Sequence, residues 1–148
     1  MKYNRFMLWG FVLVCFCVWS VVAQAADLND NGNGTVNDLG TGLVWQQGEG
    51  GRIVWEMALV YCDELQLAGK NDWRLPNYKE LQSLVDYRYY SPAVQAAFFP
   101  NLDPEFYWSS TTFAGQTKNA WFVNFYRGSV EHGNKSNSFN VRCVRSQQ

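Results

Sequence analysis

The four cysteines of this 148-residue chain form two pairs of different kinds. Cys15 and Cys17 lie inside an apolar N-terminal stretch, whereas Cys62 and Cys143 lie in sequence of mixed composition. An exported chain with an even pair of cysteines usually joins them, because thiols oxidise outside the cytoplasm. We therefore predict one disulfide, Cys62–Cys143, with two separately buried thiols as the alternative. Closing so long a loop would add about 4–5 kcal/mol in the chain-entropy model.

The first 25 residues have the features of an export signal peptide. Lys2 and Arg5 precede an apolar run over residues 6–22, and Ala23-Gln24-Ala25 gives the small-x-small site that a signal peptidase accepts. Cleavage there leaves residues 26–148 as a periplasmic or secreted domain without stable membrane insertion. An uncleaved anchor is the alternative, because the apolar run reaches the short limit of what spans a bilayer.

Charge and length limit the partners of the remaining chain. The full sequence has a net charge of −1, and removal of Lys2 and Arg5 makes the domain more acidic. A mildly acidic domain has no electrostatic reason to bind nucleic acid or an anionic membrane. Its length suits a single domain with one hydrophobic core.

Two helices are expected in the first half of the domain. Apolar residues recur at helical spacing over 55–67, which places Cys62 on the buried stripe and makes Gly69 the expected helix stop. The second helix is expected to follow Asn77, its N-cap, and to run to about Val85. Glu80 stands where a capping box needs it. Each helix is predicted to have about three turns.

The other segments predict strands and long loops. The expected strands are 35–37, 43–46, 106–109, 120–125 and 140–145. Residues 126–129 predict a hairpin turn, and the proline-rich connection 87–104 is expected to hold one helical turn at 93–97. This order predicts an α+β fold with a small antiparallel sheet, in which the N- and C-terminal strands pair. The disulfide would then join the first helix to the last strand.

Six motifs resemble those of one bacterial family, in the same order. They are Gly34–Asp38 with Thr41–Trp45, Trp55–Cys62, Asp72–Leu81, Tyr107–Thr111, Ala120–Phe125 and Val141–Arg145. Over residues 33–146 the chain resembles the Lcl C-terminal domain, a domain of unknown function named after a collagen-like adhesin. The resemblance implies a C-type-lectin-like fold, distantly related to the formylglycine-generating sulfatase-modifying enzymes. The adhesin binds sulfated polysaccharides and trimerises, but its collagen repeat is absent from this sequence.

Most residues that carry the resemblance are expected to be structural. They are Trp45, Trp55, Trp73, Arg74, Pro76, Glu80, Trp108, Ser109, Trp121, Arg142 and Arg145. The tryptophans are expected to fill an irregular core, with sugar binding as the alternative. The arginines are expected to be partly buried and paired with acids such as Asp72, Glu80 or Asp38, because an unpaired buried charge is too costly. Anion binding by these arginines is the alternative.

The sequence offers few residues for catalysis. His132 is the only histidine, and its Gly/Asn/Lys/Ser surroundings predict a solvated loop. A zinc-binding histidine pair, a nucleophile elbow and a glycine-rich phosphate loop are all missing from the sequence. Formylglycine-generating enzymes depend on a reactive cysteine pair, and here both cysteines are better used as a bridge. We therefore expect no enzyme and no cofactor, apart from the calcium hypothesis that follows.

The polar segment before the first strand could hold calcium. The oxygens would come from Asp27, Asn29, Asn31, Asn33 and Asp38. Their spacing fits an EF-type loop, with Gly32 at the sharp turn. However, helices are not expected on either side, and the last position is Asp instead of the usual bidentate Glu. A polar turn leading into a hairpin is therefore the preferred interpretation.

Exposed aromatic side chains are the second kind of candidate site. Four of them lie in polar loops: Tyr87, Tyr89, Tyr90 and Phe113. Binding residues often lie on loops of a rigid scaffold, so we place a ligand surface on 87–93, 111–119 and 128–139. We expect an exported binding or adhesion module for a carbohydrate or another cell-envelope component. A structural or protein-interaction domain is the alternative, and a sulfatase-modifying type of enzyme is a remote one.

Overall fold

The computed structural model describes residues 26–147, and the predicted signal peptide at 1–25 lies outside them. The described residues form two helices and nine strands. Their bounds are β1 (Leu28–Asp30), β2 (Thr35–Asp38), β3 (Leu43–Gln46), β4 (Arg52–Ile53), α1 (Trp55–Asp63), α2 (Tyr78–Ser83), β5 (Phe106–Thr112), β6 (Asn119–Asn124), β7 (Ser129–Asn134), β8 (Phe139–Asn140) and β9 (Val144–Ser146).

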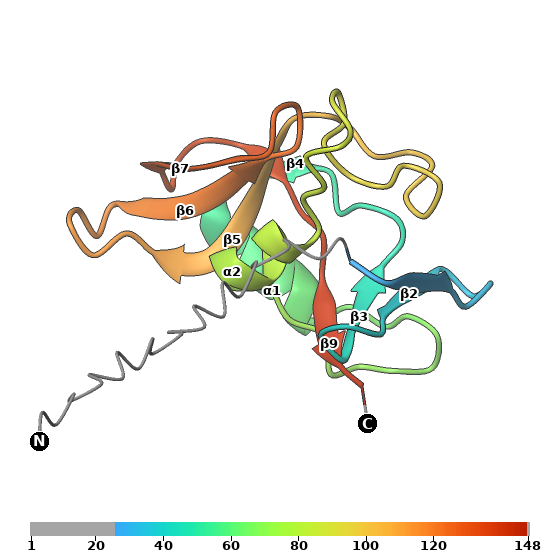
Figure 1. Ribbon diagram of the computed structural model, residues 1–148. Helices are drawn as coiled ribbons and strands as arrows, with labels where there is room; N and C mark the ends of the chain where they lie inside the picture. Colours follow the sequence, from blue (N-terminus) through green and yellow to red (C-terminus); the bar gives the residue numbers. More distant parts are fainter. Residues whose placement is uncertain (1–25, 148) are drawn as a thin grey trace, which may run out of the picture.

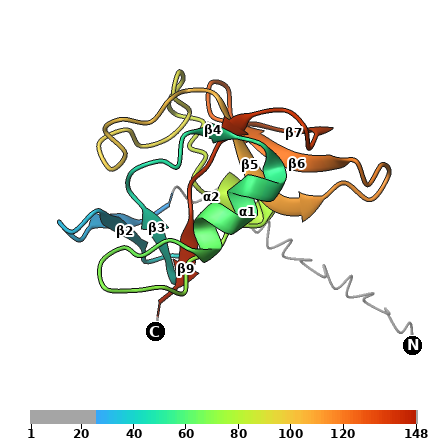
Figure 2. The ribbon, with the colours of Figure 1, turned by 180° about the vertical axis from the view of Figure 1, so that it is seen from behind.

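The strands form two sheets, in the orders β1-β2-β3-β9 and β4-β8-β5-β6-β7. Figure 1 shows the sheets on opposite sides of the molecule, with the C-terminal segment running from β8 in one to β9 in the other. The two helices lie on opposite faces of the molecule, since α2 is nearer the viewer in Figure 1 and α1 is nearer in Figure 2, which is seen from behind. Trp45 of β3 pairs with Val144 of β9, so the N- and C-terminal strands pair as predicted. The α+β class is confirmed, but the prediction of one small antiparallel sheet is wrong, because the strands divide into two sheets and β5 pairs with β8 in parallel.

The predicted N-terminal hairpin forms between β2 and β3. The carboxylate of Asp38 accepts hydrogen bonds from the backbone N–H groups of Gly40 and Thr41, at 3.0 and 3.2 Å, and so stabilises the turn. Gly42 has a φ of 69°, a left-handed conformation that favours glycine. Turn chemistry that is local in sequence therefore determines this hairpin.

Both helices are shorter than predicted. α1 ends at Asp63 because the chain then enters a tight turn, in which Leu67 and Lys70 exchange backbone hydrogen bonds. Gly69, with a φ of 70°, belongs to this turn and is not a helix cap. α2 has the predicted capping box between Asn77 and Glu80, but it ends at Ser83, after fewer than two turns.

The strand predictions near the C-terminus also need correction. β5 continues to Thr112, and the predicted strand 140–145 is divided into β8 and β9 because the chain passes from one sheet to the other there. Cys143 therefore lies just before β9 and not within it. The helical turn predicted at 93–97 is absent there, and the chain instead turns at 96–98, where the N–H groups of Phe98 and Phe99 donate to the carbonyls of Gln95 and Ala96.

The core consists of two clusters on opposite faces of β5 and β6. Tyr107 and Val123 face the first cluster, which includes Leu81 of α2. Their neighbours Trp108 and Phe122 face the second, which includes the residues of α1 that are buried. Successive side chains of a strand point to opposite faces, so these strands separate the two clusters and are covered on both sides.

The predicted disulfide joins Cys62 of α1 to Cys143, which lies 81 residues later. Their Cα atoms are 5.4 Å apart, and both side chains are fully buried in the second cluster. The bridge thus fixes α1 to the segment that connects the two sheets.

Candidate ligand-binding surfaces

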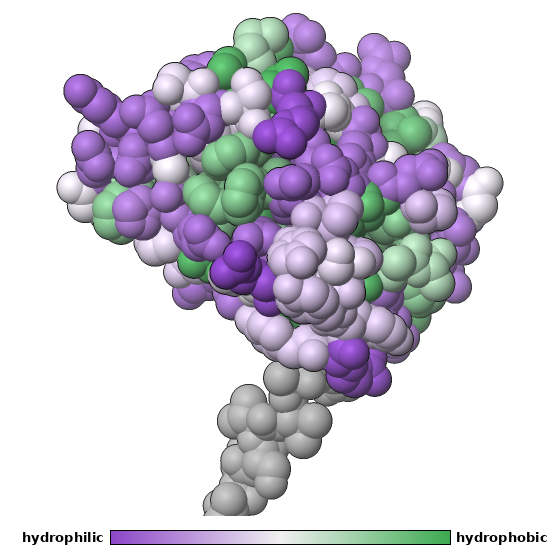
Figure 3. Space-filling view, turned by 90° about the horizontal axis from the view of Figure 1, so that it is seen from above, coloured by the Kyte–Doolittle hydropathy of each residue, from purple (hydrophilic) through white to green (hydrophobic). Residues whose placement is uncertain are grey.

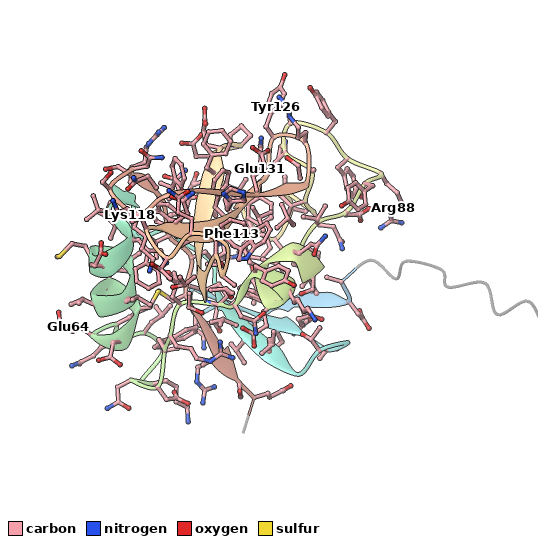
Figure 4. The ribbon with its side chains drawn as sticks, turned by 90° about the vertical axis from the view of Figure 1, so that its left-hand side faces the viewer. Glu64, Arg88, Phe113, Lys118, Tyr126 and Glu131 are labelled. Atoms are coloured by element: carbon pink, nitrogen blue, oxygen red, sulfur yellow. A yellow bond between two sulfur atoms is a disulfide. The ribbon has the colours of Figure 1, made fainter. Side chains whose placement is uncertain are left out.

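Four exposed tyrosine side chains gather beside the turn between β6 and β7, and we call them the tyrosine patch. They are Tyr87, Tyr89, Tyr90 and Tyr126, with 69, 49, 67 and 40% of their surface exposed. The rings of Tyr90 and Tyr126 meet edge to face, with centroids 4.9 Å apart. Figure 4 places Tyr126 and Arg88 away from Glu64, which follows α1. The tyrosine patch thus combines three tyrosines of the predicted loop 87–93 with Tyr126, which the sequence analysis did not predict.

Backbone hydrogen bonds hold the two loops of the tyrosine patch together. The N–H of Ser91 donates to the carbonyl of Tyr126 at 3.0 Å, and the N–H of Ala93 donates to that of Phe125 at 2.7 Å. Buried Asp86 accepts from the Arg88 guanidinium at 2.6 Å, which holds the pKa of the Asp86 carboxyl below its ordinary value. The phenol rings thus stand on a fixed frame.

A shallow hollow of about 270 Å³ adjoins the tyrosine patch. Tyr89 and Tyr90 form one side of it, and Pro92, Val94, Gln95, Ala96 and Ala97 form the rest. The Tyr126 side chain raises the pKa of Tyr90, so this phenol is neutral at physiological pH. Seen from the side of these loops, the surface is mixed, with pale and hydrophobic residues lying between strongly hydrophilic ones (Figure 3). Ring faces and neutral hydroxyl groups are what this surface offers a ligand.

Phe113 does not join the tyrosine patch, and it lies instead in a second group of aromatic side chains. Phe113 stacks on the imidazole of His132, with ring centroids 3.9 Å apart and planes within 4°. Trp121 stands perpendicular to both rings, and Tyr78 of α2 packs on Trp121. His132 lies in β7, so residues 129–134 are a strand and not part of the predicted loop. We call these four residues the aromatic stack.

The five residues of the calcium hypothesis do not converge on one point. β1 and β2 pair antiparallel, so Asp38, opposite Leu28, lies at the far end of the hairpin from Asn31 and Asn33. The amide oxygen of Asn33 accepts from Thr35 at 2.7 Å, while Asp38 accepts from its own turn. Asp27 is near Asp38 through its carbonyl, which accepts from the N–H of Leu39, and Asn29 pairs with Asn37. Within residues 26–147, groups of three or more His, Cys, Asp or Glu side chains placed to hold a metal are absent.

Two motif arginines pair with acids that the sequence singled out. Arg74 makes a two-point hydrogen bond with Glu80, at 2.7 and 2.8 Å, on the surface. Arg145 makes a two-point hydrogen bond with Asp72, at 2.7 and 3.0 Å, and the Arg145 side chain is almost completely buried.

The third, Arg142, has a partner that the sequence did not suggest. Its fully buried guanidinium lies 3.2 Å from Glu49 and donates to the carbonyls of Gln46 and Gln47, each at 2.6 Å. The hydroxyl of Tyr107 also donates a hydrogen bond to the carboxylate of Glu49. Glu49 lies in a Gly-rich loop without a recognisable motif, so only the folded chain brings it to Arg142.

The sequence profile of the Lcl C-terminal domain matches residues 34–145. This chain belongs to that family. The matched span reaches from just before β2 into β9, so it includes the disulfide, the tyrosine patch and the aromatic stack. No curated protein matches the chain.

In this Lcl C-terminal domain, several motif residues connect one element to another. The indole N–H of Trp55 donates to the carbonyl of Ser109 at 2.8 Å, and the hydroxyl of Ser109 donates to the carbonyl of Trp121 at 2.7 Å. The carbonyl of Pro76 accepts from the N–H of Ser110 at 2.8 Å. These contacts join α1, the segment before α2, and the neighbouring strands β5 and β6.

All five tryptophans were expected in the core, but their observed burial differs. Trp45, Trp73 and Trp108 are buried, whereas Trp55 and Trp121 are only half-buried. Lys135 places its ammonium 3.8 Å from the ring centroid of Trp55, and Trp121 belongs to the aromatic stack. Trp55 nevertheless packs against the second core cluster, so the predicted core position is wrong for Trp121 but not for Trp55.

The disulfide of this Lcl C-terminal domain indicates an oxidising, extracytoplasmic compartment. Among residues 26–147, we find no helix with the length and apolar character that membrane crossing requires.

Proposed function

We propose that this Lcl C-terminal domain is an exported carbohydrate-binding module with a C-type-lectin-like fold, released to the periplasm or the medium. Its ligand is held on the tyrosine patch. The observation that carries the proposal is the gathering of four exposed phenols, from two loops tied by backbone hydrogen bonds, beside a shallow hollow.

The chemistry of the tyrosine patch suits a sugar. A sugar ring has an apolar face that packs on an aromatic ring and hydroxyl groups at its edge that exchange hydrogen bonds with phenols. Tyrosine provides both kinds of contact and has few rotatable bonds, so little conformational entropy is lost on binding. Arg88 is engaged by Asp86, whereas the exposed Arg127 lies near enough to Tyr90 to act on its pKa. We therefore expect the phenols to hold the sugar by packing and neutral hydrogen bonds, with Arg127 at the edge of the tyrosine patch.

Docking of another envelope protein on the tyrosine patch is the alternative. Tyrosine is also enriched among the residues that dominate protein interfaces. The hollow beside the patch favours a sugar, because its volume of about 270 Å³ suits a ligand of one or two rings. A catalytic step is not part of the proposal, since Cys62 and Cys143 are joined and buried, whereas formylglycine chemistry needs free thiols.

The experiment is a glycan array probed with residues 26–148 secreted into an oxidising compartment, followed by titration of the best hit. We expect Tyr90→Ala and Tyr126→Ala each to weaken binding about tenfold, which corresponds to about 1.4 kcal/mol. Met57→Ala is the matched control, because Met57 is similarly exposed but lies on α1. Unchanged affinity in the Tyr90→Ala/Tyr126→Ala double variant would refute the proposal. A silent array together with an envelope protein whose capture needs both tyrosines would favour the docking alternative.

A further inference from the structure

A second cleft, of about 190 Å³, lies between the four-stranded sheet and the turn that follows α1. Figure 2 shows this turn running beside β9. Asn31, Asn33 and Asn37 line the cleft from the N-terminal hairpin, Lys70 lines it from the turn, and Arg145 lines it from β9. We call it the amide cleft. It is separate from the tyrosine patch, which shares none of its residues.

The sheet register places the side chains of the amide cleft next to one another. Asn37 of β2 pairs with Val44 of β3, and Val44 pairs with Arg145 of β9. Directly opposite residues of neighbouring strands project to the same face of a sheet. An amide, an isopropyl group and a guanidinium therefore stand in a row across the wall of the cleft.

Hydrogen bonds among the asparagines determine which groups remain for a ligand. The amide nitrogen of Asn31 donates to the hydroxyl of Thr35 at 2.8 Å and to the amide oxygen of Asn37 at 2.9 Å. The Thr35 hydroxyl in turn donates to the amide oxygen of Asn33 at 2.7 Å. Since the oxygens of Asn33 and Asn37 accept inside this network, their NH₂ groups are left as donors. Asn31 keeps its amide oxygen as an acceptor.

The charges around the amide cleft favour an anion. Lys70 and Arg145 both line it, and the neighbouring carboxylate of Asp72 has both oxygens engaged by Arg145. That ion pair is close to neutral, so among the described residues that line the cleft the ammonium of Lys70 contributes one uncompensated positive charge. Asn31 and Asn33, which the sequence offered to calcium, thus lie in a cleft whose charge opposes a cation.

We propose that the amide cleft binds a small hydroxycarboxylic acid, of which a uronic acid is the representative. Lys70 holds the carboxylate, the NH₂ groups of Asn33 and Asn37 donate to hydroxyl oxygens, and Asn31 accepts from a hydroxyl. The cleft volume suits one monosaccharide-sized unit. This site does not depend on the function proposed for the tyrosine patch.

Calorimetric titration of residues 26–148 with three probes at constant ionic strength tests the proposal. Galacturonate has the carboxylate and the hydroxyls, galactose has the hydroxyls alone, and acetate has the carboxylate alone. We expect galacturonate to bind with a Kd of about 1 mM or lower, and at least tenfold more tightly than either of the others. The absence of galacturonate binding, or equal binding of galactose or acetate, would overturn the assignment.

Two variants test whether galacturonate binds in the amide cleft. Lys70→Met removes the charge and keeps the aliphatic chain, and we expect about tenfold weaker galacturonate binding. Lys79→Met is the matched control, because Lys79 is also exposed but lies on α2. Asn37→Asp keeps the acceptor for Asn31 and replaces the NH₂ donor by a charged oxygen, so galacturonate binding should be lost while the fold is retained by circular dichroism. Equal affinity of the Lys70 and Lys79 variants, or full binding by Asn37→Asp, would contradict the proposed site.

Discussion

Arg142 and Glu49 form an ion pair inside the molecule, with the Arg142 side chain fully buried and its Nη2 atom 3.2 Å from the Glu49 carboxylate. The guanidinium also lies 4.4 Å from the ring centroid of Phe99. Burial lowers the pKa of Arg142, and the neighbouring Tyr107 and Glu49 oppose that shift. The charge of Glu49 is therefore what makes a buried arginine tolerable here.

The Glu49 charge can be removed without loss of its hydrogen-bond acceptor. In Glu49→Gln the side-chain oxygen still accepts from Tyr107, but Arg142 is left as an uncompensated buried charge, which should lower the free energy of unfolding by about 3 kcal/mol. Glu80→Gln is the control, because its partner Arg74 is exposed, and we expect a loss below about 1 kcal/mol. Urea unfolding measures both, and equal losses would contradict this interpretation.

Two buried tryptophans allow a matched comparison of one hydrogen bond. The indole N–H of Trp108 donates to the carbonyl of Ile53 at 3.0 Å, whereas that of Trp45 is buried without a partner among the described residues. Both side chains are fully buried. Trp→Phe creates a similar cavity at each position, so Trp108→Phe should cost about 1–2 kcal/mol more than Trp45→Phe. A larger loss for Trp45→Phe in urea unfolding would show that packing outweighs this hydrogen bond.

The disulfide should contribute much of the stability of so small a domain. Cys62→Ala/Cys143→Ala frees a loop whose ends are 81 residues apart, and we expect the free energy of unfolding to fall by about 3–5 kcal/mol. Denaturant unfolding measures the loss, and mass spectrometry of non-reduced peptides tests the bridge itself. Free sulfhydryls on both residues in the secreted protein would contradict the pairing.

Acid should destabilise the domain through its paired carboxylates. Hydrogen bonds from Arg88 and Arg145 lower the pKa values of Asp86 and Asp72 from the ordinary value of 3.8. The unfolded chain therefore binds protons first, so the stability from these pairs is present above about pH 4 and is lost as pH falls through the lower folded pKa values. We expect Tm to fall between pH 5 and pH 3, and to fall less in Asp86→Asn. An identical pH dependence of Tm in wild type and Asp86→Asn would contradict this assignment.

Sequence reasoning worked where a structure depends on a few consecutive residues or on covalent chemistry. The capping box at Asn77 and Glu80 and the hairpin ending at Gly42 need only neighbouring groups, so their patterns were sufficient. It failed at the end of α1, because the periodic pattern continues past Asp63 while the chain leaves the helix for a turn at Leu67–Lys70, with Leu65 and Leu67 packed against the second core cluster.

The candidate sites show the same division. Tyr87, Tyr89 and Tyr90 were predicted from a polar loop rich in aromatic residues, and the structure leaves all three exposed. Tyr126 was missed because its position beside Tyr90 depends on the backbone pairing of two distant loops. Phe113 was assigned to the same surface because a sequence shows how polar a loop is but not which way the loop faces.

The sequence alone determined the cysteine pair, the capped second helix, the first hairpin and the family, because each depends on residue identity at short or fixed spacing. Only the tertiary structure decided that Glu49 neutralises Arg142, that Tyr126 joins the tyrosine patch and that three asparagines meet Lys70 in the amide cleft. These contacts join residues far apart in the chain. Their geometry follows from strand register and core packing, which a linear pattern of residues does not specify.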